Sequence, residues 1–248
     1  MRSVLYTKFL LDLLLIFFDN TLMQKKTVKM IKIIVSCLFV ACFVAKPSHA
    51  HVQHYNDLNL IKFDIFRNDS KVGFHSISFE RDKGKLIVRN LINFEIKKLG
   101  ISFYKYESEG TEIYTEEGNL LSFESKTSED GDIKYCSIKK QGDYYVVDGE
   151  KFKGEVKKDF LLSSYWNHEL LKQTTQIAGI TCAVREQKVN FIKNETIKVL
   201  GVDTETAVFD IKGEDLDTQV WYRKKDWVIV QQVLNTRGVW LYTIDELN

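Results

Sequence analysis

Apolar and polar residues alternate with a period of two through most of the chain beyond residue 58. In the longest such run, every second residue from Leu86 to Ile96 is apolar except Asn90. A shorter run places His75 on the same parity as Ile77 and Phe79. This period is typical of β-strands with one buried face. The pattern therefore predicts a β-rich protein in which the side chain of His75 points inward.

Short turn motifs rich in glycine, asparagine and aspartate separate these runs, as in Asn68-Asp69-Ser70 and Asp130-Gly131-Asp132. Such motifs between alternating segments indicate hairpins, and hairpins indicate an antiparallel sheet. The only proline, Pro47, lies ahead of all these runs, so their ladders of hydrogen bonds are uninterrupted. We expect residues 60–246 to form one all-β domain of about a dozen mostly antiparallel strands, arranged as a curled sheet or open half-barrel.

One stretch breaks the alternation, FLLSSYWNHELL at residues 160–171. Ser163 or Ser164 can cap a helix, and the large apolar residues recur at helical spacing. We predict one short helix at about residues 163–172, with Trp166 lying on the concave face of the sheet. The cluster of Ser163, Ser164, His168 and Glu169 also resembles catalytic chemistry. That interpretation is disfavoured, because triad partners converge from separate elements and no G-x-S-x-G motif is present.

The N-terminal region has the three-part layout of a secretory signal peptide. A lysine-rich start at Met23 precedes an apolar run from Ile33 to Ala45, and Ser48-His49-Ala50 supplies small residues at a cleavage site. We expect cleavage after Ala50 and a periplasmic or secreted protein, with residues 51–59 as a flexible lead-in. An additional apolar run at residues 9–18 suggests that translation starts at Met23 or Met30. The alternative is a short uncleaved membrane hairpin, which would make this segment the membrane contact.

Charge and motifs narrow the classes of function. Residues 1–50 hold seven of the 35 basic and two of the 34 acidic residues, which leaves the rest of the chain with a net charge of −4. Without a basic block, nucleic acid is not expected as a partner. The sequence contains no metal-spaced Cys/His cluster, phosphate loop or dinucleotide fingerprint. We therefore expect no cofactor and no metal.

Two cysteines, Cys136 and Cys182, remain after the predicted cleavage. In an oxidising compartment such a pair is expected to form a disulfide. The alternative is two buried free thiols that pack as small apolar side chains.

Several short motifs together resemble one known family. They are Phe63-Asp64-Ile65, Val72-Gly73-Phe74-His75, Leu99-Gly100, Gly118-Asn119-Leu120, Tyr165-Trp166-Asn167, Leu200-Gly201 and Trp221-Tyr222. In order and spacing they are similar to an exported proteobacterial family catalogued as domain of unknown function 6134. The resemblance covers about residues 60–244. It implies export and an all-β fold, and it implies no known activity.

The inward position of His75 has two interpretations. It is either a core histidine bonded to a neighbouring polar group or a ligand-binding group on the concave face. We predict that any functional surface lies there, formed by His75, Tyr165, Trp166 and Asn167.

Three functions remain open. The favoured one is a non-enzymatic envelope protein that binds an apolar small molecule or a segment of an envelope protein on the concave face. The second is a hydrolase-type enzyme built around His75, which requires a carboxylate within hydrogen-bond reach of the histidine ring. The third is a structural or adaptor protein that pairs a free sheet edge with another chain.

Overall fold

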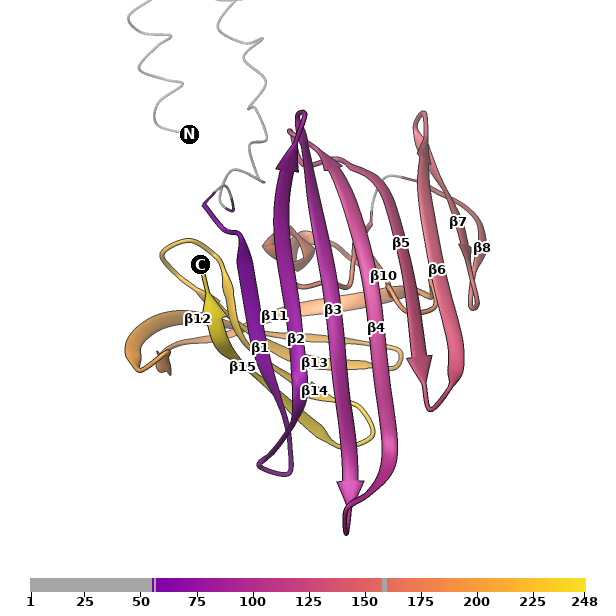
Figure 1. Cartoon of the computed structure of the whole chain (residues 1–248). Helices are drawn as coiled ribbons and strands as arrows, with labels where there is room; N and C mark the ends of the chain where they lie inside the picture. The colour runs from indigo at the N-terminus through magenta and orange to yellow at the C-terminus, as the bar shows by residue number, and fades with distance from the viewer. Residues whose placement is uncertain (1–54, 56, 158–159) are drawn as a thin grey trace, which may run out of the picture. The chain divides into compact units, whose positions relative to one another are not determined.

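A computed structural model describes residue 55, residues 57–157 and residues 160–248. Fifteen strands form a single sheet (Figure 1). The signal peptide predicted at residues 1–50 lies outside the described residues. The strands are β1 (Leu60–Arg67), β2 (Ser70–Asp82), β3 (Lys85–Lys98), β4 (Ile101–Thr115), β5 (Leu120–Glu129), β6 (Asp132–Gln141), β7 (Tyr144–Gly149), β8 (Lys153–Lys157), β9 (Leu161–Leu162), β10 (Thr175–Ile177), β11 (Val184–Val199), β12 (Val202–Gly213), β13 (Leu216–Arg223), β14 (Ile229–Asn235) and β15 (Val239–Leu247).

The order of strands forces the sheet to curl. It runs from β8 back to β1, across to β15, and back again to β9, so that β8 and β9 form the two edges. Fifteen flat strands would span about 67 Å at the usual strand spacing. Only three residues lie between the end of β8 and the start of β9, and the four Cα–Cα steps that join the two strands reach about 14 Å at most. The edges therefore approach each other, and the sheet forms an open barrel. Every ladder is antiparallel except the short pairing of β9 with β10.

The predicted fold class is confirmed, with two corrections. The strands number fifteen rather than about a dozen, because very short strands such as β9 and β10 carry no readable alternation. The helix predicted at residues 163–172 is wrong. Only a five-residue 3-10 helix forms there, η2 (His168–Lys172). In the part of the chain that the structure describes, no helix is long and apolar enough to cross a membrane.

Tertiary contacts explain why no α-helix forms in this stretch. The backbone of Tyr165 has a φ of +48°, and the amide of Ser163 donates to the carbonyl of Ile177 across the parallel pairing. Asn167 then caps η2 through its side chain, which accepts from the amide of Glu169 at 3.1 Å. The apolar residues that recur at helical spacing in this stretch, Leu162, Trp166 and Leu170, are nevertheless buried. The helical spacing identified the buried side chains correctly, although the backbone that carries them is not an α-helix.

The main core lies on the concave face around Trp166. Its ring contacts the rings of Tyr55, Phe79 and Tyr114 at centroid distances of 5.2, 5.4 and 5.6 Å. A separate apolar cluster of Ile65, Phe94, Tyr106 and Trp240 occupies another part of the same face.

Part of the predicted flexible lead-in, residues 51–59, belongs to this core. Tyr55 and Leu58 are both buried, and Asn59 donates its amide to the carbonyl of Asn248. The expectation of a flexible segment is therefore wrong for these residues. A lone aromatic ring ahead of the first strand shows no periodicity that would reveal its burial. Residues 51–54 lie outside the described residues.

Cys136 on β6 and Cys182 after β10 are adjacent in space. Their sulfur atoms are 1.97 Å apart and their Cα atoms 5.0 Å apart, which is disulfide geometry. Gly149, opposite Cys136 on β7, makes room for the pair. A Cβ atom on Gly149 would lie 2.4 Å from the Cβ of Cys182, so any larger residue would displace the linkage. The segment that carries Trp166 is thus tied to the sheet at Cys182.

Candidate functional site

The strand registers bring five side chains together on the concave face. Phe63 on β1 lies opposite His75 on β2, and His75 lies opposite Ile92 on β3. Tyr242 on β15 lies opposite Gln232 on β14. Ring contacts of His75 join the residues on β1 to β3 with those on β14 and β15. The centroid of its ring lies 5.9 Å from that of Phe63 and 6.3 Å from that of Tyr242. We call these five residues the His75 patch.

Although it faces inward, the His75 patch is incompletely covered. His75, Ile92, Gln232 and Tyr242 all keep partial contact with solvent, while Phe63 is buried. Within the described part of the chain, three polar atoms of the patch make no hydrogen bond. They are Nδ1 of His75, Oε1 of Gln232 and the hydroxyl of Tyr242. The patch therefore offers hydrogen-bonding atoms beside apolar surface, a combination typical of small-molecule sites.

Neighbouring hydrogen bonds assign the tautomer of His75. The amide nitrogen of Asn90 donates to Oε1 of Glu112 at 2.8 Å, which directs the Asn90 carbonyl oxygen toward His75. Nε2 of His75 donates to that oxygen at 3.3 Å, so Nδ1 carries a free lone pair. Burial lowers the pKa of His75 to about 4, and the bond to Asn90 only partly opposes this shift. The ring is consequently neutral at pH 7.

Tyr242 is also uncharged at neutral pH. Burial raises the pKa of its phenol, and repulsion from neighbouring tyrosines adds to the shift. The patch thus combines a neutral imidazole, a phenol and a primary amide, with no charged side chain among its members. Uncharged hydrogen-bonding groups on a ligand complement such a surface better than an ion does.

A buried carboxylate connects the patch to the core around Trp166. Glu112 on β4 is fully buried and accepts from Asn90, from the hydroxyl of Tyr114 at 2.5 Å and from Nε1 of Trp166 at 3.1 Å. Burial raises the pKa of Glu112, while the bonds from Tyr114 and Trp166 oppose this shift. His75, Asn90, Glu112 and Trp166 therefore form one continuous chain of hydrogen bonds.

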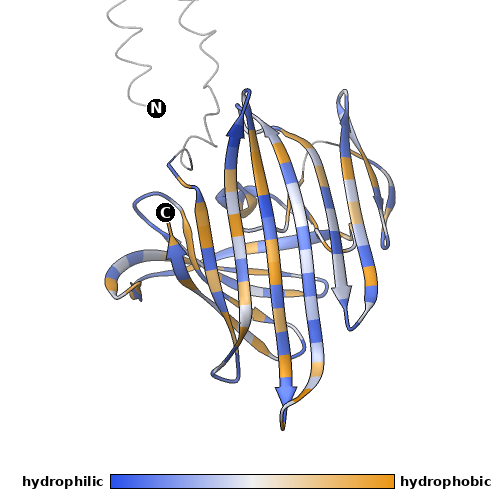
Figure 2. Cartoon of the chain, viewed as in Figure 1, coloured by the Kyte–Doolittle hydropathy of each residue, from blue (hydrophilic) through white to orange (hydrophobic). Residues whose placement is uncertain are grey.

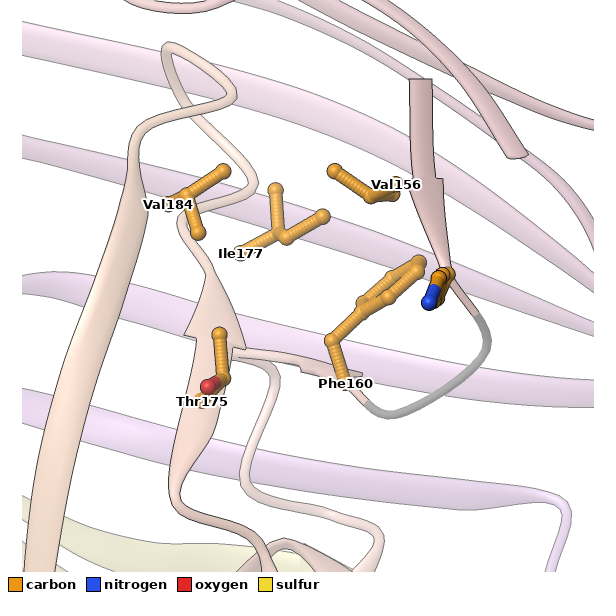
Figure 3. Close-up of a pocket in the computed structure, with 6 residues that line it drawn as sticks. Val156, Phe160, Thr175, Ile177 and Val184 are labelled. Carbon is orange, nitrogen blue, oxygen red and sulfur yellow. The ribbon is translucent and has the colours of Figure 1, made fainter. Parts of the chain in front are cut away.

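A second candidate site lies where the two edges of the sheet approach each other. A pocket of about 260 Å³ lies there, lined by Val156, Lys157, Phe160, Thr175, Ile177 and Val184. Figure 3 shows Val156 and Phe160 on one side of this pocket and Ile177 and Val184 on the other. Among the described strands, only β7 pairs with β8, so one edge of β8 is free beside the pocket. We call this site the seam pocket.

Comparison with known proteins places the chain in a family. The family model described as "Domain of unknown function (DUF6134)" matches residues 63–244. The chain belongs to the DUF6134 family. The fold of this DUF6134 domain is similar to a crystal structure of a beta-barrel-like protein of domain of unknown function DUF1849 from Brucella abortus. The TM-score is 0.55 at 10% identity, over 77% of this chain and 97% of that one. Such a likeness supports the barrel-like fold alone. No curated protein matched.

In this DUF6134 domain the four residues that the sequence grouped as a ligand site differ in their exposure and hydrogen bonding. His75 lies on the patch. Tyr165 is partly exposed, and its carbonyl accepts from the hydroxyl of Tyr222 at 2.7 Å. Trp166 is fully buried, and Asn167 uses its side-chain oxygen to cap η2. Trp166 reaches His75 only through Glu112 and Asn90, so the predicted group does not form one accessible surface.

Sequence reasoning missed four other residues near His75. Asn90 carried a usable signal, because it is the one polar residue on the apolar parity of the longest run. Glu112, Gln232 and Tyr242 carried none, since their strands mix polar and apolar residues on the inward face.

Of the residues considered for catalysis, His168 and Glu169 lie together, with Nε2 of His168 3.4 Å from Oε1 of Glu169, but Ser163 and His168 bond to different partners. Oγ of Ser163 accepts from the amide of Gly179 at 3.3 Å, while Nδ1 of the buried His168 lies 2.6 Å from the hydroxyl of Tyr55. The ring of His168 also stacks on Trp227 at 5.4 Å. Among the described residues, the side chain bonded to His75 is Asn90, not the carboxylate that a hydrolase mechanism requires. The same residues contain no group of three or more potential metal ligands.

Proposed function

We propose that this DUF6134 protein is exported to the periplasm or secreted, and that its mature domain, beginning at His51, is a non-enzymatic binding protein. Its ligand is a small, uncharged, amphipathic molecule that occupies the His75 patch. The observation that carries this proposal is the set of unpaired polar atoms on a partly exposed inward face. The mixture of side chains on that face supports an amphipathic ligand rather than a purely apolar one, because Phe63 and Ile92 lie beside an imidazole, a phenol and an amide.

The chemistry of the patch defines what the ligand must carry. Nδ1 of His75 and Oε1 of Gln232 accept hydrogen bonds, so they select a ligand hydroxyl or amide as donor. The hydroxyl of Tyr242 both donates and accepts. A polar group left unpaired in a dehydrated site costs about 1–3 kcal/mol. A molecule without donors would therefore bind more weakly than one that satisfies these atoms.

Native mass spectrometry of the protein purified from its cellular envelope tests the binding proposal. We expect a co-purifying small molecule on the wild type and its loss from Tyr242→Phe and from Gln232→Leu. Tyr144→Phe is the matched control, because Tyr144 is exposed and its hydroxyl bonds Gln141 away from the patch. Equal retention by all variants, or no bound molecule on the wild type, would contradict the proposal.

The intact mass of the same preparation tests export. A mass that begins at His51 supports cleavage after Ala50. A mass that retains residues 33–50 contradicts it.

The seam pocket favours a second candidate function, strand addition. The free edge of β8 offers unpaired backbone groups, and the adjoining apolar pocket has room for one large side chain of an added strand. An adaptor role would use this edge to pair with an extended segment of an envelope protein. Hydrogen exchange is the test: protection of β8 amides that appears only with an envelope fraction supports it, and unchanged exchange contradicts it.

A further inference from the structure

The hairpin between β3 and β4 carries an exposed apolar apex. Leu99 is 96% exposed, Ile101 73% and Phe103 76%. In Figure 1 this hairpin extends beyond its neighbours at the lower end of the sheet. Figure 2 shows the apex as hydrophobic next to the hydrophilic end of β3. We call residues 97–105 the β3–β4 tip.

The turn itself makes the apolar apex unusual. Leu99 and Gly100 form a two-residue loop with φ values of +53° and +79°, as in a type I′ hairpin turn. The first position of such a turn favours asparagine, aspartate or glycine, because other side chains are strained at positive φ. Leu99 is thus unfavourable both for its backbone conformation and for its exposure to water. Neither property contributes to the stability of the domain.

A collar of lysines surrounds the apex. Lys97, Lys98 and Lys105 lie within the β3–β4 tip, which contains no acidic residue. The amino group of Lys97 lies 2.9 Å from Glu95, and that of Lys105 lies 3.0 Å from Glu107, yet both lysine side chains remain more than half exposed. Within the described residues, Lys98 has no carboxylate partner.

We propose that the β3–β4 tip docks on the surface of an anionic phospholipid membrane. Leu99, Ile101 and Phe103 enter the interface between headgroups and acyl chains, and the lysines contact lipid phosphates at the headgroup level. Apolar insertion combined with basic residues is how peripheral proteins hold to anionic membranes. Lysine stems also follow the apolar surface while their charges stay in water. This membrane contact is independent of the His75 patch.

A second hairpin of the same domain serves as a control for this proposal. The hairpin between β11 and β12 has the same kind of turn, with Leu200 and Gly201 at φ +48° and +82°. Leu200 and Val202 are more than half exposed. The equivalent stretch, residues 198–206, holds one lysine, Lys198, which pairs with Asp203 at 2.8 Å, and a second acidic residue, Glu205. This second tip therefore presents an apolar apex without a cationic collar.

Sedimentation of the full chain with vesicles tests the proposal. One set of vesicles is pure phosphatidylcholine and the other includes phosphatidylglycerol. We expect binding to the anionic set only. The triple variant Leu99→Ser, Ile101→Ser, Phe103→Ser should weaken it about tenfold or more. Each of the substitutions Lys97→Gln, Lys98→Gln and Lys105→Gln should weaken it about fivefold.

The control variant Leu200→Ser, Val202→Ser should bind the anionic vesicles as the wild type does. All these positions are exposed, so unchanged thermal midpoints verify that the variants are folded. Three outcomes would overturn the proposal. They are equal binding to both sets of vesicles, binding that is unaffected by the substitutions in the β3–β4 tip, and self-association of the wild type that the same substitutions abolish without any vesicle binding. The last outcome would identify the tip as a contact between copies of this chain.

Discussion

Two regions of one concave face differ in how far they are filled. Around Trp166 the face is closed, because the segment that follows β9 crosses it and places a fully buried indole among three aromatic rings. At the His75 patch the same face remains partly exposed and carries unpaired polar atoms. Both regions are built on strands of the same sheet with the same alternation. The difference arises from the covering segment, not from the strands.

The two regions also differ in how far the hydrogen-bonding capacity of their polar groups is used. The oxygens of Glu112 accept from three donors, so the carboxylate binds the covering segment to the sheet. The polar atoms of His75 and Tyr242 have capacity left for another molecule. Saturated polar groups contribute to stability and specificity of the fold, whereas unsaturated ones are available for binding. Substitutions in the closed region should therefore act on stability, and those in the patch on binding.

The largest expected effect is that of Trp166→Ala. Removal of a fully buried indole should lower the free energy of unfolding by about 3–5 kcal/mol. Trp166→Phe keeps a ring but loses the bond to Glu112, so its loss should be smaller. Urea unfolding monitored by circular dichroism measures both. A loss below about 1 kcal/mol for Trp166→Ala would place the indole outside the cooperative core.

The second largest effect on stability is expected from the pair of cysteines. A bridge between Cys136 and Cys182, separated by 46 residues, should stabilise the domain by about 4 kcal/mol in the chain-entropy model. Unfolding with and without reductant measures this contribution. Alkylation of the unfolded, unreduced protein, followed by peptide mapping, is the control. Label on both residues 136 and 182 would show that they are free thiols and that the covering segment is not pinned.

Glu112→Gln should change how stability depends on pH. Because burial raises the pKa of Glu112, the folded state binds its proton more tightly than the unfolded state does. The contribution of this group to stability is fully present at acidic pH. It falls by about 1.4 kcal/mol per pH unit between the ordinary carboxyl pKa and the raised value. The variant should lack this fall, so it gains relative to the wild type as the pH rises. Parallel curves of unfolding free energy against pH would refute the assignment.

His75→Gln should have the smallest effect at neutral pH, about 1 kcal/mol or less, because the amide can still donate to Asn90. Its pH dependence has the opposite sign to that of Glu112. With a folded pKa of about 4 and an ordinary value of 6.5, the contribution of His75 is complete above 6.5 and is lost as the pH falls toward 4. Unfolding curves between these values should be flatter in the variant. A His75 resonance that titrates near 6.5 would contradict the lowered pKa.

Much of the sheet could be predicted from the sequence, and particular residues show which features could not. The run from Leu86 to Ile96 became β3 with its apolar parity inward, and His75 points to the same face. Trp166 was correctly expected to cover the concave face, because apolar spacing indicates burial. The backbone conformation around Trp166 was not predicted correctly. The hydrogen bond to Ile177 competes with helix formation, and the local spacing of residues does not reveal that contact. Tyr55 was missed, since its partner His168 lies 113 residues away.

The strands, their buried faces and their hairpins follow from the amino-acid sequence, because side-chain alternation and turn residues act over a few neighbouring positions. Tertiary contacts determine which strands form the edges, which part of the concave face is covered and whether the two cysteines are adjacent. Each of these depends on contacts between segments far apart in the chain, such as β1 with β15. Such pairings are selected by the combined burial and hydrogen bonding of the whole sheet, and no local stretch of residues encodes them.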